Sequence, residues 1–198
     1  FGPILKNGDL DNPALARHLS PAVMSYHGIQ YQSMAPEVMD AAQLDWLQSH
    51  LWILSGLYGC VRPFHGVSPY RLEMGAKLSV DDVRDLYAFW GDKLACAIAP
   101  TGSNTTVVNL ASVEYAKAVL PHLAGDATTV TCLFGEGVRN GKPIQRSTAS
   151  KKARGSMVRW MAENKLEDAS GLTAFDVGYR HLPELSNKNT LVFLNEQT

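Results

Sequence analysis

The sequence lacks any long hydrophobic run, and it does not open with a signal-peptide pattern. A helix needs roughly 18 consecutive apolar residues to span a bilayer. A secretory leader needs a charged start followed by an apolar core. These absences argue against a membrane protein and against a membrane partner.

Cysteine and histidine are scarce and scattered, which argues against a metal site. The three cysteines, Cys60, Cys96 and Cys132, are odd in number and have no CxxC spacing. None of the six histidines stands in an HxxxH or HExxH pattern. Disulfide frameworks and zinc clusters are therefore not expected. We expect no metal, reduced thiols and a cytoplasmic location.

Familiar catalytic motifs are absent as well. The sequence contains no G-x-S-x-G elbow, no Walker phosphate loop and no glycine set for dinucleotide binding. No motif names a reaction, so we expect no cofactor.

What is present is an ordinary globular composition with segregated charge. The 198 residues are 45% hydrophobic and 19% charged, which suits one domain over residues 1–198. The net charge is −1, but residues 139–165 hold eight basic residues against the single acid Glu163, a local charge of +7. Such segregation creates a positive field that favours anionic partners. The opening Phe1-Gly2-Pro3 lacks an initiator methionine, so we expect that an N-terminal portion is missing.

Hydrophobic periodicity predicts strands that alternate with helices. This pattern, with one hairpin, predicts an α+β fold in which helices flank a mixed sheet. The expected strands cover residues 22–25, 52–54, 105–110 and 190–194, and residues 128–134 and 144–148 form the hairpin around a turn at 135–141. One helix is expected to start at Asn12, and another to run from Ser79 to about residue 98. Further helices are expected over residues 36–50, 113–120 and 150–165, with a helix or turn at 171–179.

Residues 51–75 are unusually rich in glycine, proline, tyrosine and charged side chains. Glycine lets the backbone approach another group closely, and proline fixes φ. Polar side chains on a stiffened loop are typical of a binding or catalytic site. The alternative is a well-packed irregular connection in which Arg71 and Glu73 form an ion pair.

Four segments are expected to be strands that end in polar turns: residues 23–28, 51–59, 107–112 and 145–155. In open sheets, ligands gather beyond the ends of strands. If these four ends meet, they form one site. Its members are Tyr26, Ser55, Tyr58, Arg62, Tyr70, Arg71, Glu73, Asn109, Ser112, Glu114, Tyr115, Lys151, Lys152 and Arg154.

The segment KKARG, residues 151–155, is expected at the start of a helix. Basic side chains there oppose the helix dipole, which favours acids at the N-terminus. The placement suggests that the charge serves an external anion or phosphate. The alternative is a solvated helix face whose lysine and arginine stems cover apolar surface.

Several motifs together resemble the YaaA family of bacterial peroxide-stress proteins. They are LSGLYG at 54–59 with Arg62-Pro63, PYRLEMG at 69–75, LYAFWGDKL at 86–94, VVNLAS at 107–112 with Glu114-Tyr115, KKARG at 151–155, Gly178-Tyr179 and the final strand that contains Val192-Phe193. They keep the family's order over nearly the whole chain. The family normally begins with an upstream strand bearing Ser-Pro-Ala-Lys and further helices, which this sequence does not contain.

The resemblance implies a cytosolic protein that protects cells from hydrogen peroxide and is associated with lower free iron. It also implies a distinct fold with a positively charged cleft, a helix-hairpin-helix-like element and DNA binding. On this resemblance, KKARG, Arg146 and Arg159 line the basic cleft, and the loop of Gly56 and Gly59 is the candidate hairpin. Backbone N–H groups of such a hairpin approach phosphates closely.

Two functions follow as hypotheses. The first is a sequence-nonspecific binder of double-stranded or structured DNA. The second is an enzyme that acts on a small anionic or nucleotide-like ligand. In the second, Glu73 is the acid or base, Lys151 or Lys152 the nucleophile or anion clamp, and Arg71 the orienting group, with Asn109 nearby.

Overall fold

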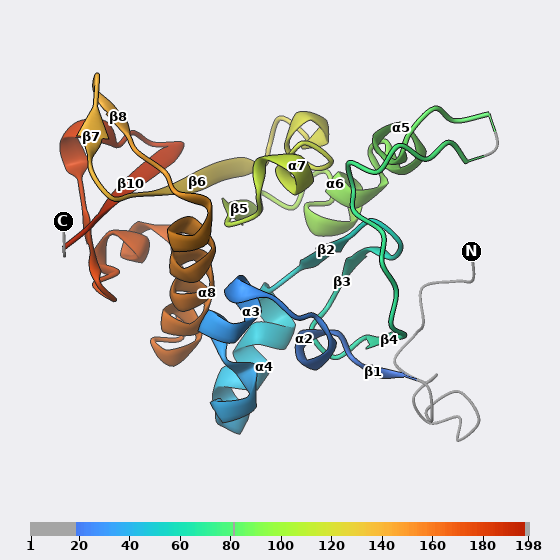
Figure 1. The fold of residues 1–198 in the computed structure, drawn as a ribbon, viewed down its shortest axis with the longest axis horizontal. Coiled ribbons are helices and arrows are strands. Elements are labelled where there is room, and N and C mark those ends of the chain that lie inside the picture. The colour runs from blue at the N-terminus through green and yellow to red at the C-terminus, as the bar shows by residue number, and fades with distance from the viewer. Residues whose placement is uncertain (1–18, 81, 197–198) are drawn as a thin grey trace. The chain divides into compact units, whose positions relative to one another are not determined.

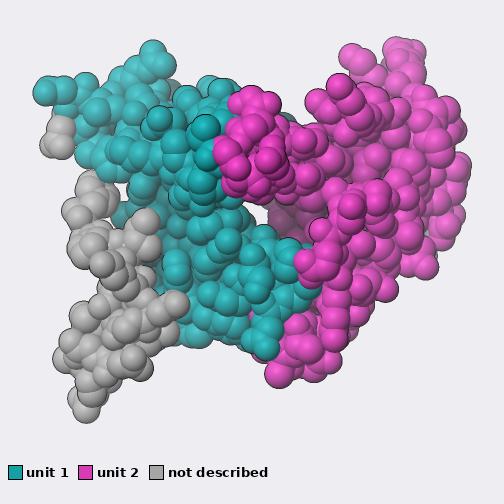
Figure 2. Space-filling view, turned by 180° about the vertical axis from the view of Figure 1, so that it is seen from behind, with its two compact units in different colours: residues 1–26, 45–101, 111–124 teal, residues 27–44, 102–110, 125–198 magenta. Residues whose placement is uncertain are grey.

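The computed structural model describes residues 19–80 and 82–196, and Figure 1 shows its ribbon. The helix predicted to start at Asn12 lies outside the described residues. The chain forms two compact units, coloured separately in Figure 2. Among the described residues, unit 1 comprises 19–26, 45–80, 82–101 and 111–124, and unit 2 comprises 27–44, 102–110 and 125–196. The single-domain assignment over residues 1–198 stays a prediction.

Unit 2 is built on a four-stranded mixed sheet, which confirms the predicted α+β class. β6 is parallel to both β5 and β10, and β9 is antiparallel to β10. β6 alternates partly exposed and buried residues along TTVTCLFG, as expected for a strand with one face in a core. In spatial order the strands are β5 (Thr106–Asn109), β6 (Thr128–Gly135), β10 (Thr190–Asn195) and β9 (Tyr179–His181).

A long helix, α8 (Ser147–Glu163), packs against this sheet (Figure 1). Its buried residues fall into two stripes. Ala153 and Met157 belong to the aromatic core that contains Phe134 and Phe193. The other stripe includes Gly155, which lies against the backbone of α3 (Ile29–Met34). The lysines of KKARG lie on the remaining, exposed face.

The predicted hairpin of unit 2 is in a different place from the one expected. β6 runs on to Gly135, and a separate two-stranded hairpin follows, formed by β7 (Val138–Arg139) and β8 (Lys142–Pro143). Asn140 and Gly141 make its turn, with φ of 52° and 71°. An Asn-Gly pair with two positive φ values fits the tight turn that matches strand twist, so it sets the position of the hairpin.

Unit 1 contains two small antiparallel sheets and short helices. β1 (Ser20–Pro21) pairs with β4 (Gly66–Val67), and β2 (Ile53–Ser55) pairs with β3 (Gly59–Val61). The core gathers Cys60, Met74, Leu86, Leu94 and Val119. The helices of unit 1 include α5 (Leu86–Trp90), α6 (Lys93–Ile98) and α7 (Val113–Ala116), followed by the 3-10 turn η3 (Leu120–His122).

Several predicted boundaries are corrected by capping chemistry. The helix expected from residue 36 is a 3-10 turn, η2 (Pro36–Val38), followed by α4 (Ala41–His50). Asp40 and Gln43 exchange side-chain-to-backbone hydrogen bonds of 2.8 and 3.1 Å, a capping box that starts α4. The helix expected from Ser79 starts at α5, where Asp85 accepts from the Ala88 N–H at 2.8 Å.

Two further predictions need correction. The strand expected at residues 22–25 is the short helix α2 (Ala22–Ser25), since the Tyr26 N–H bonds back to Ala22 at 3.1 Å. The helix expected from residue 150 starts at Ser147, which places the lysines of KKARG in its second turn. The segment predicted at 171–179 is the 3-10 turn η4 (Ala169–Ala174), and η5 (Pro183–Leu185) precedes β10. Within the part of the chain that the structure describes, no helix is long and apolar enough to cross a membrane.

Candidate nucleic-acid interface

A network of hydroxyl groups lies inside unit 1, around the fully buried Ser55. Ser55 Oγ accepts from the backbone N–H groups of Leu57 at 3.2 Å and Tyr58 at 2.8 Å. The same oxygen lies 2.5 Å from the Tyr70 hydroxyl, which lies 2.9 Å from the Tyr26 hydroxyl. The structure therefore brings together four predicted site residues of unit 1, Tyr26, Ser55, Tyr58 and Tyr70.

The direction of these bonds follows from counting donors and acceptors. The two N–H groups occupy the lone pairs of Ser55 Oγ, so its own O–H donates to Tyr70. Tyr70 then donates to Tyr26. Burial raises the pKa of Tyr70 well above its ordinary range, and the bond from Ser55 only partly opposes this. Tyr70 is thus a neutral phenol that ties the LSGLYG loop to the PYRLEMG segment.

The glycines of the LSGLYG loop are required by close packing in unit 1. A Cβ at Gly56 would lie 2.7 Å from the Leu72 carbonyl oxygen. Gly59 has a φ of +76°, and a Cβ there would lie 2.8 Å from side-chain atoms of Trp90 and Leu94. Both glycines are buried, and the Gly56 carbonyl accepts from Trp90 Nε1 at 3.1 Å. Their predicted role as phosphate-binding backbone stays a prediction.

Arg62 anchors its own loop. Its Nη1 donates to the carbonyls of Ser49 at 2.9 Å and Leu51 at 3.3 Å, and its guanidinium stacks on Trp52 at 3.8 Å. Burial, and then the charge of Arg62, lower the pKa of the neighbouring His65. This arrangement is one that holds a loop together.

Unlike Arg62, the two charged side chains of PYRLEMG, Arg71 and Glu73, are exposed. The alternative of an ion pair between these two described residues is not observed. Glu114 Oε1 accepts from the Gly75 N–H at 2.7 Å, which fastens the end of the segment. Ser112 caps α7 by accepting from the Tyr115 N–H at 3.4 Å, and burial raises the pKa of Tyr115.

Asn109 ends β5 in unit 2, and its amide is engaged within the sheet. Asn109 Nδ2 donates to Thr131 Oγ1 at 3.3 Å, and the two residues are register partners of β5 and β6. Asn109 and the KKARG segment belong to unit 2, whereas the hydroxyl network belongs to unit 1. The expectation that all four strand ends meet at one site stays a prediction.

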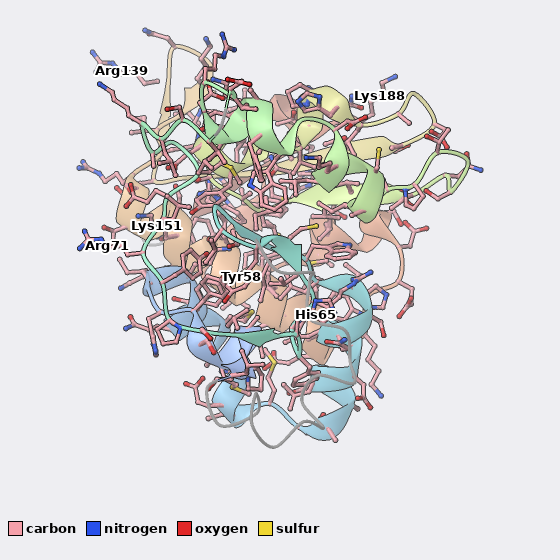
Figure 3. All side chains as sticks on the ribbon, turned by 90° about the vertical axis from the view of Figure 1, so that its right-hand side faces the viewer. Tyr58, His65, Arg71, Arg139, Lys151 and Lys188 are labelled. Atoms are coloured by element: carbon pink, nitrogen blue, oxygen red, sulfur yellow. The ribbon has the colours of Figure 1, made fainter. Side chains whose placement is uncertain are left out.

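Unit 2 carries five exposed cations along one stretch of chain, Arg139, Lys142, Arg146, Lys151 and Lys152, which we call the basic strip. The strip runs from the β7–β8 hairpin to the second turn of α8. Among the described residues only one of the five has an ion-pair partner, because Arg146 Nε lies 2.5 Å from Glu136 Oε2. Figure 3 labels Arg139 and Lys151, which lie on the same side of that view.

The other basic candidates on α8 are more restricted. Arg159 Nε is paired with Glu163 Oε1 at 2.7 Å, one turn along the helix. Arg154 is half-buried, burial lowers its pKa, and its Nε has no hydrogen-bond partner among the described residues.

A hollow of about 760 Å³ lies at the start of α8. Arg146, Ser147, Thr148, Ala149 and Lys152 line it on the helix side. The first turn of α8 contains no acid, and its N-cap residue Arg146 makes no side-chain cap hydrogen bond to the helix. The other walls come from Glu136, Tyr179 and Asn195, and burial raises the pKa of Tyr179.

The two buried thiols, Cys60 and Cys132, are in environments that disfavour reaction with peroxide. Burial raises the pKa of Cys60 to about 11 and that of Cys132 to about 12. The thiolate is the reactive form of cysteine, so both side chains behave as buried apolar groups. Within residues 19–80 and 82–196, no three His, Cys, Asp or Glu side chains gather as a metal site.

Residues 5–185 match the profile of the family described as "Peroxide stress protein YaaA". The chain belongs to the YaaA family. It is 47% identical over 184 residues to a "UPF0246 protein" of Pediococcus pentosaceus, with 92% of this chain and 72% of that protein covered. A UPF0246 protein of Lachnoclostridium phytofermentans is 46% identical over 186 residues, with 93% and 71% covered.

Membership in the YaaA family confirms the resemblance and supports a role in peroxide stress. The structure adds residues of this YaaA-family chain that were not among the predicted site residues. Arg139 and Lys142 were counted only as charge, Tyr179 was noted only in the Gly178-Tyr179 motif, and Glu136 and Asn195 were not among the site candidates. The Asn140-Gly141 dipeptide was the available signal for the hairpin that carries Arg139 and Lys142.

Proposed function

We propose that this protein binds double-stranded or structured DNA without sequence preference, through the basic strip of unit 2. In this proposal it acts in the cytoplasm during peroxide stress, where it limits oxidative DNA damage and is linked to a lower level of free iron. The observation that carries the proposal is the basic strip itself, with five exposed cations and one paired acid. The peroxide-stress family supports the biological setting.

The charges of the basic strip are better explained by phosphate binding than by a contribution to folding stability. Exposed cations without acidic neighbours contribute little to folding, but each one that meets a phosphate releases a condensed counterion. The first turn of α8 adds backbone N–H groups beside Arg146 and Lys152. Helix N-termini and basic side chains are common contacts to the DNA backbone, and such contacts carry no sequence preference.

The enzyme alternative has less support. It requires Arg71 and Glu73 of unit 1 to act together with Asn109 and Lys151 of unit 2. Asn109 already bonds to Thr131, and Glu73 is exposed. A small anionic ligand at the hollow by α8 stays a prediction.

The direct test removes two cations of the basic strip. We expect Lys151→Ala/Lys152→Ala to bind a short fluorescent duplex roughly tenfold more weakly in anisotropy titrations, whatever the sequence of the duplex. Both side chains are exposed on α8, so folding is preserved. The matched control is Lys77→Ala/Lys188→Ala, which removes the same charge from two exposed positions outside the strip. Equal affinities for the two variants contradict the proposal.

Removing the negative charge of Glu136, which pairs with Arg146, should strengthen DNA binding. Glu136→Gln removes the partner of Arg146 and one negative charge beside Lys152. We expect duplex affinity to rise about threefold in the same titrations, because Arg146 becomes free to meet phosphate. Glu184→Gln, at an exposed acid of η5, changes the net charge equally and should have a smaller effect. Weaker binding by Glu136→Gln would place Arg146 outside the interface.

A further inference from the structure

The hairpin of β7 and β8 is a short, well-defined projection of unit 2, which Figure 1 shows standing away from the four-stranded sheet. We call residues 138–143 the basic arm. Val138 pairs with Pro143, and Arg139 pairs with Lys142. The turn residues Asn140 and Gly141 both have positive φ, so the tip is a tight two-residue turn.

The base of the basic arm is fixed to the sheet. The Glu136 N–H donates to the Ile144 carbonyl at 3.0 Å, and the Ile144 N–H donates to the Gly137 carbonyl at 2.8 Å. A Cβ at Gly135 would lie 2.8 Å from Pro143 Cβ, so only glycine permits this approach. The arm is therefore held at its base and presents its tip to solvent.

The tip carries an unfavourable pair of charges. Arg139 and Lys142 are directly opposite in the ladder, so both side chains stand on the same face of the ribbon. Like charges in this position destabilise a hairpin. Both are exposed, and no ion pair joins either to an acid in the described part of the chain. An anion supplied by a partner would remove the repulsion.

The two-stranded shape of the basic arm fits one groove of a DNA duplex and not the other. A two-stranded ribbon fits the major groove, about 12 Å wide, whereas the minor groove, about 6 Å wide, is too narrow.

We propose that the basic arm enters the major groove of duplex DNA, with Arg139 and Lys142 against the phosphates that line the groove. This inference rests on the proposed function, and it assigns the groove that the protein occupies. Lys151, Lys152 and the first turn of α8 then meet the flanking backbone. Figure 3 places Lys188 on the opposite side of the view from Arg139, so the control position is remote from the arm.

The first part of the test is a charge-matched comparison. We expect Arg139→Ala/Lys142→Ala to weaken duplex binding roughly tenfold in anisotropy titrations, and Lys77→Ala/Lys188→Ala to weaken it less than about twofold. Thermal melting should show that the arm variant is as stable as the unmodified chain or more stable, since the repulsion is relieved. An affinity equal to that of the control overturns the proposal.

The second part asks which groove is used. A duplex with glucosylated hydroxymethylcytosine has a blocked major groove and an unchanged backbone charge. We expect the unmodified chain to bind it roughly tenfold more weakly, and the arm variant to lose nothing further on it. If the arm variant loses the same factor on both duplexes, the arm does not enter the groove. If the arm variant binds normally while Lys151→Ala/Lys152→Ala does not, only the role of the arm is wrong. If the unmodified chain binds neither duplex, the proposed function fails with it.

Discussion

Replacing Gly155 by alanine is expected to lower the free energy of unfolding by about 3 kcal/mol, at the upper end of the usual overpacking cost. A Cβ at this position would overlap the Gln30 carbonyl oxygen and would lie 2.9 Å from the Gln30 carbonyl carbon and 3.0 Å from the Met34 nitrogen. All three atoms belong to the backbone of α3, so no side chain can rotate away. The added methyl group must push α3 and α8 apart.

Chemical denaturation of Gly155→Ala and of Gly125→Ala provides the comparison. Gly125 also lies in unit 2, but a Cβ there meets nothing within 4 Å. That variant should change the free energy of unfolding by less than about 0.5 kcal/mol. Equal and small effects at both positions would mean that α3 does not pack on α8 as described. The glycine of KKARG would then have no structural explanation.

Ser55→Ala is expected to cost about 3 kcal/mol, because one lost oxygen leaves several polar groups without partners. The N–H groups of Leu57 and Tyr58 lose their acceptor, and Tyr70 loses its donor. The site is fully buried, so water cannot readily replace the hydroxyl. Ser49→Ala is the control, since Ser49 is exposed and its hydroxyl donates to the Asp45 carbonyl.

A double-mutant cycle identifies the network as the cause. If Ser55 donates to Tyr70, then Ser55→Ala and Tyr70→Phe should be coupled by about 1 kcal/mol or more in the free energy of unfolding. Additive effects of the two changes would show that the 2.5 Å contact does not contribute to stability. In that case the LSGLYG loop would not be held by its hydroxyl groups.

The sequence predicts the sheet of unit 2 better than its connections. The β-branched runs around Val107 and Val130 locate β5 and β6, because a half-buried strand favours such residues on both faces. The hairpin was misplaced because the stretch from Gly135 to Gly141 contains three glycines, and composition alone does not select the turn. Only Asn140-Gly141 supplies two adjacent residues with positive φ.

Helix starts were predicted least well, since they depend on which side chain caps the helix. Ser79 was chosen over Asp85 as the cap, and the start of α8 was expected at residue 150 instead of Ser147. In the structure Asp85 is the cap of α5, and Ser150 is buried, where its hydroxyl donates to the Phe134 carbonyl at 3.3 Å. A hydroxyl that serves the core and one that caps a helix look alike in a sequence.

The same ambiguity, between a polar group that serves the core and one that serves a site, applies to the candidate site in residues 51–75. Residues 51–75 were correctly identified as unusual, but the polar groups of Ser55 and Tyr70 bond to each other and to Tyr26, which is 44 residues away from Tyr70. A single sequence does not show such distant partners. The excess of charge around KKARG is different, because exposed cations without acids remain available for a partner, and charge can be counted directly.

The salt dependence of duplex binding tests the central claim most directly. Affinity should be measured between about 50 and 200 mM salt, and its logarithm plotted against the logarithm of the salt concentration. With the four cations of the basic strip that have no ion-pair partner among the described residues on phosphates, the slope should be about −3.6, and removing Lys151 and Lys152 should reduce its magnitude by about 1.8. A slope near zero, or one that is unchanged in Lys151→Ala/Lys152→Ala, would contradict binding of DNA through the basic strip.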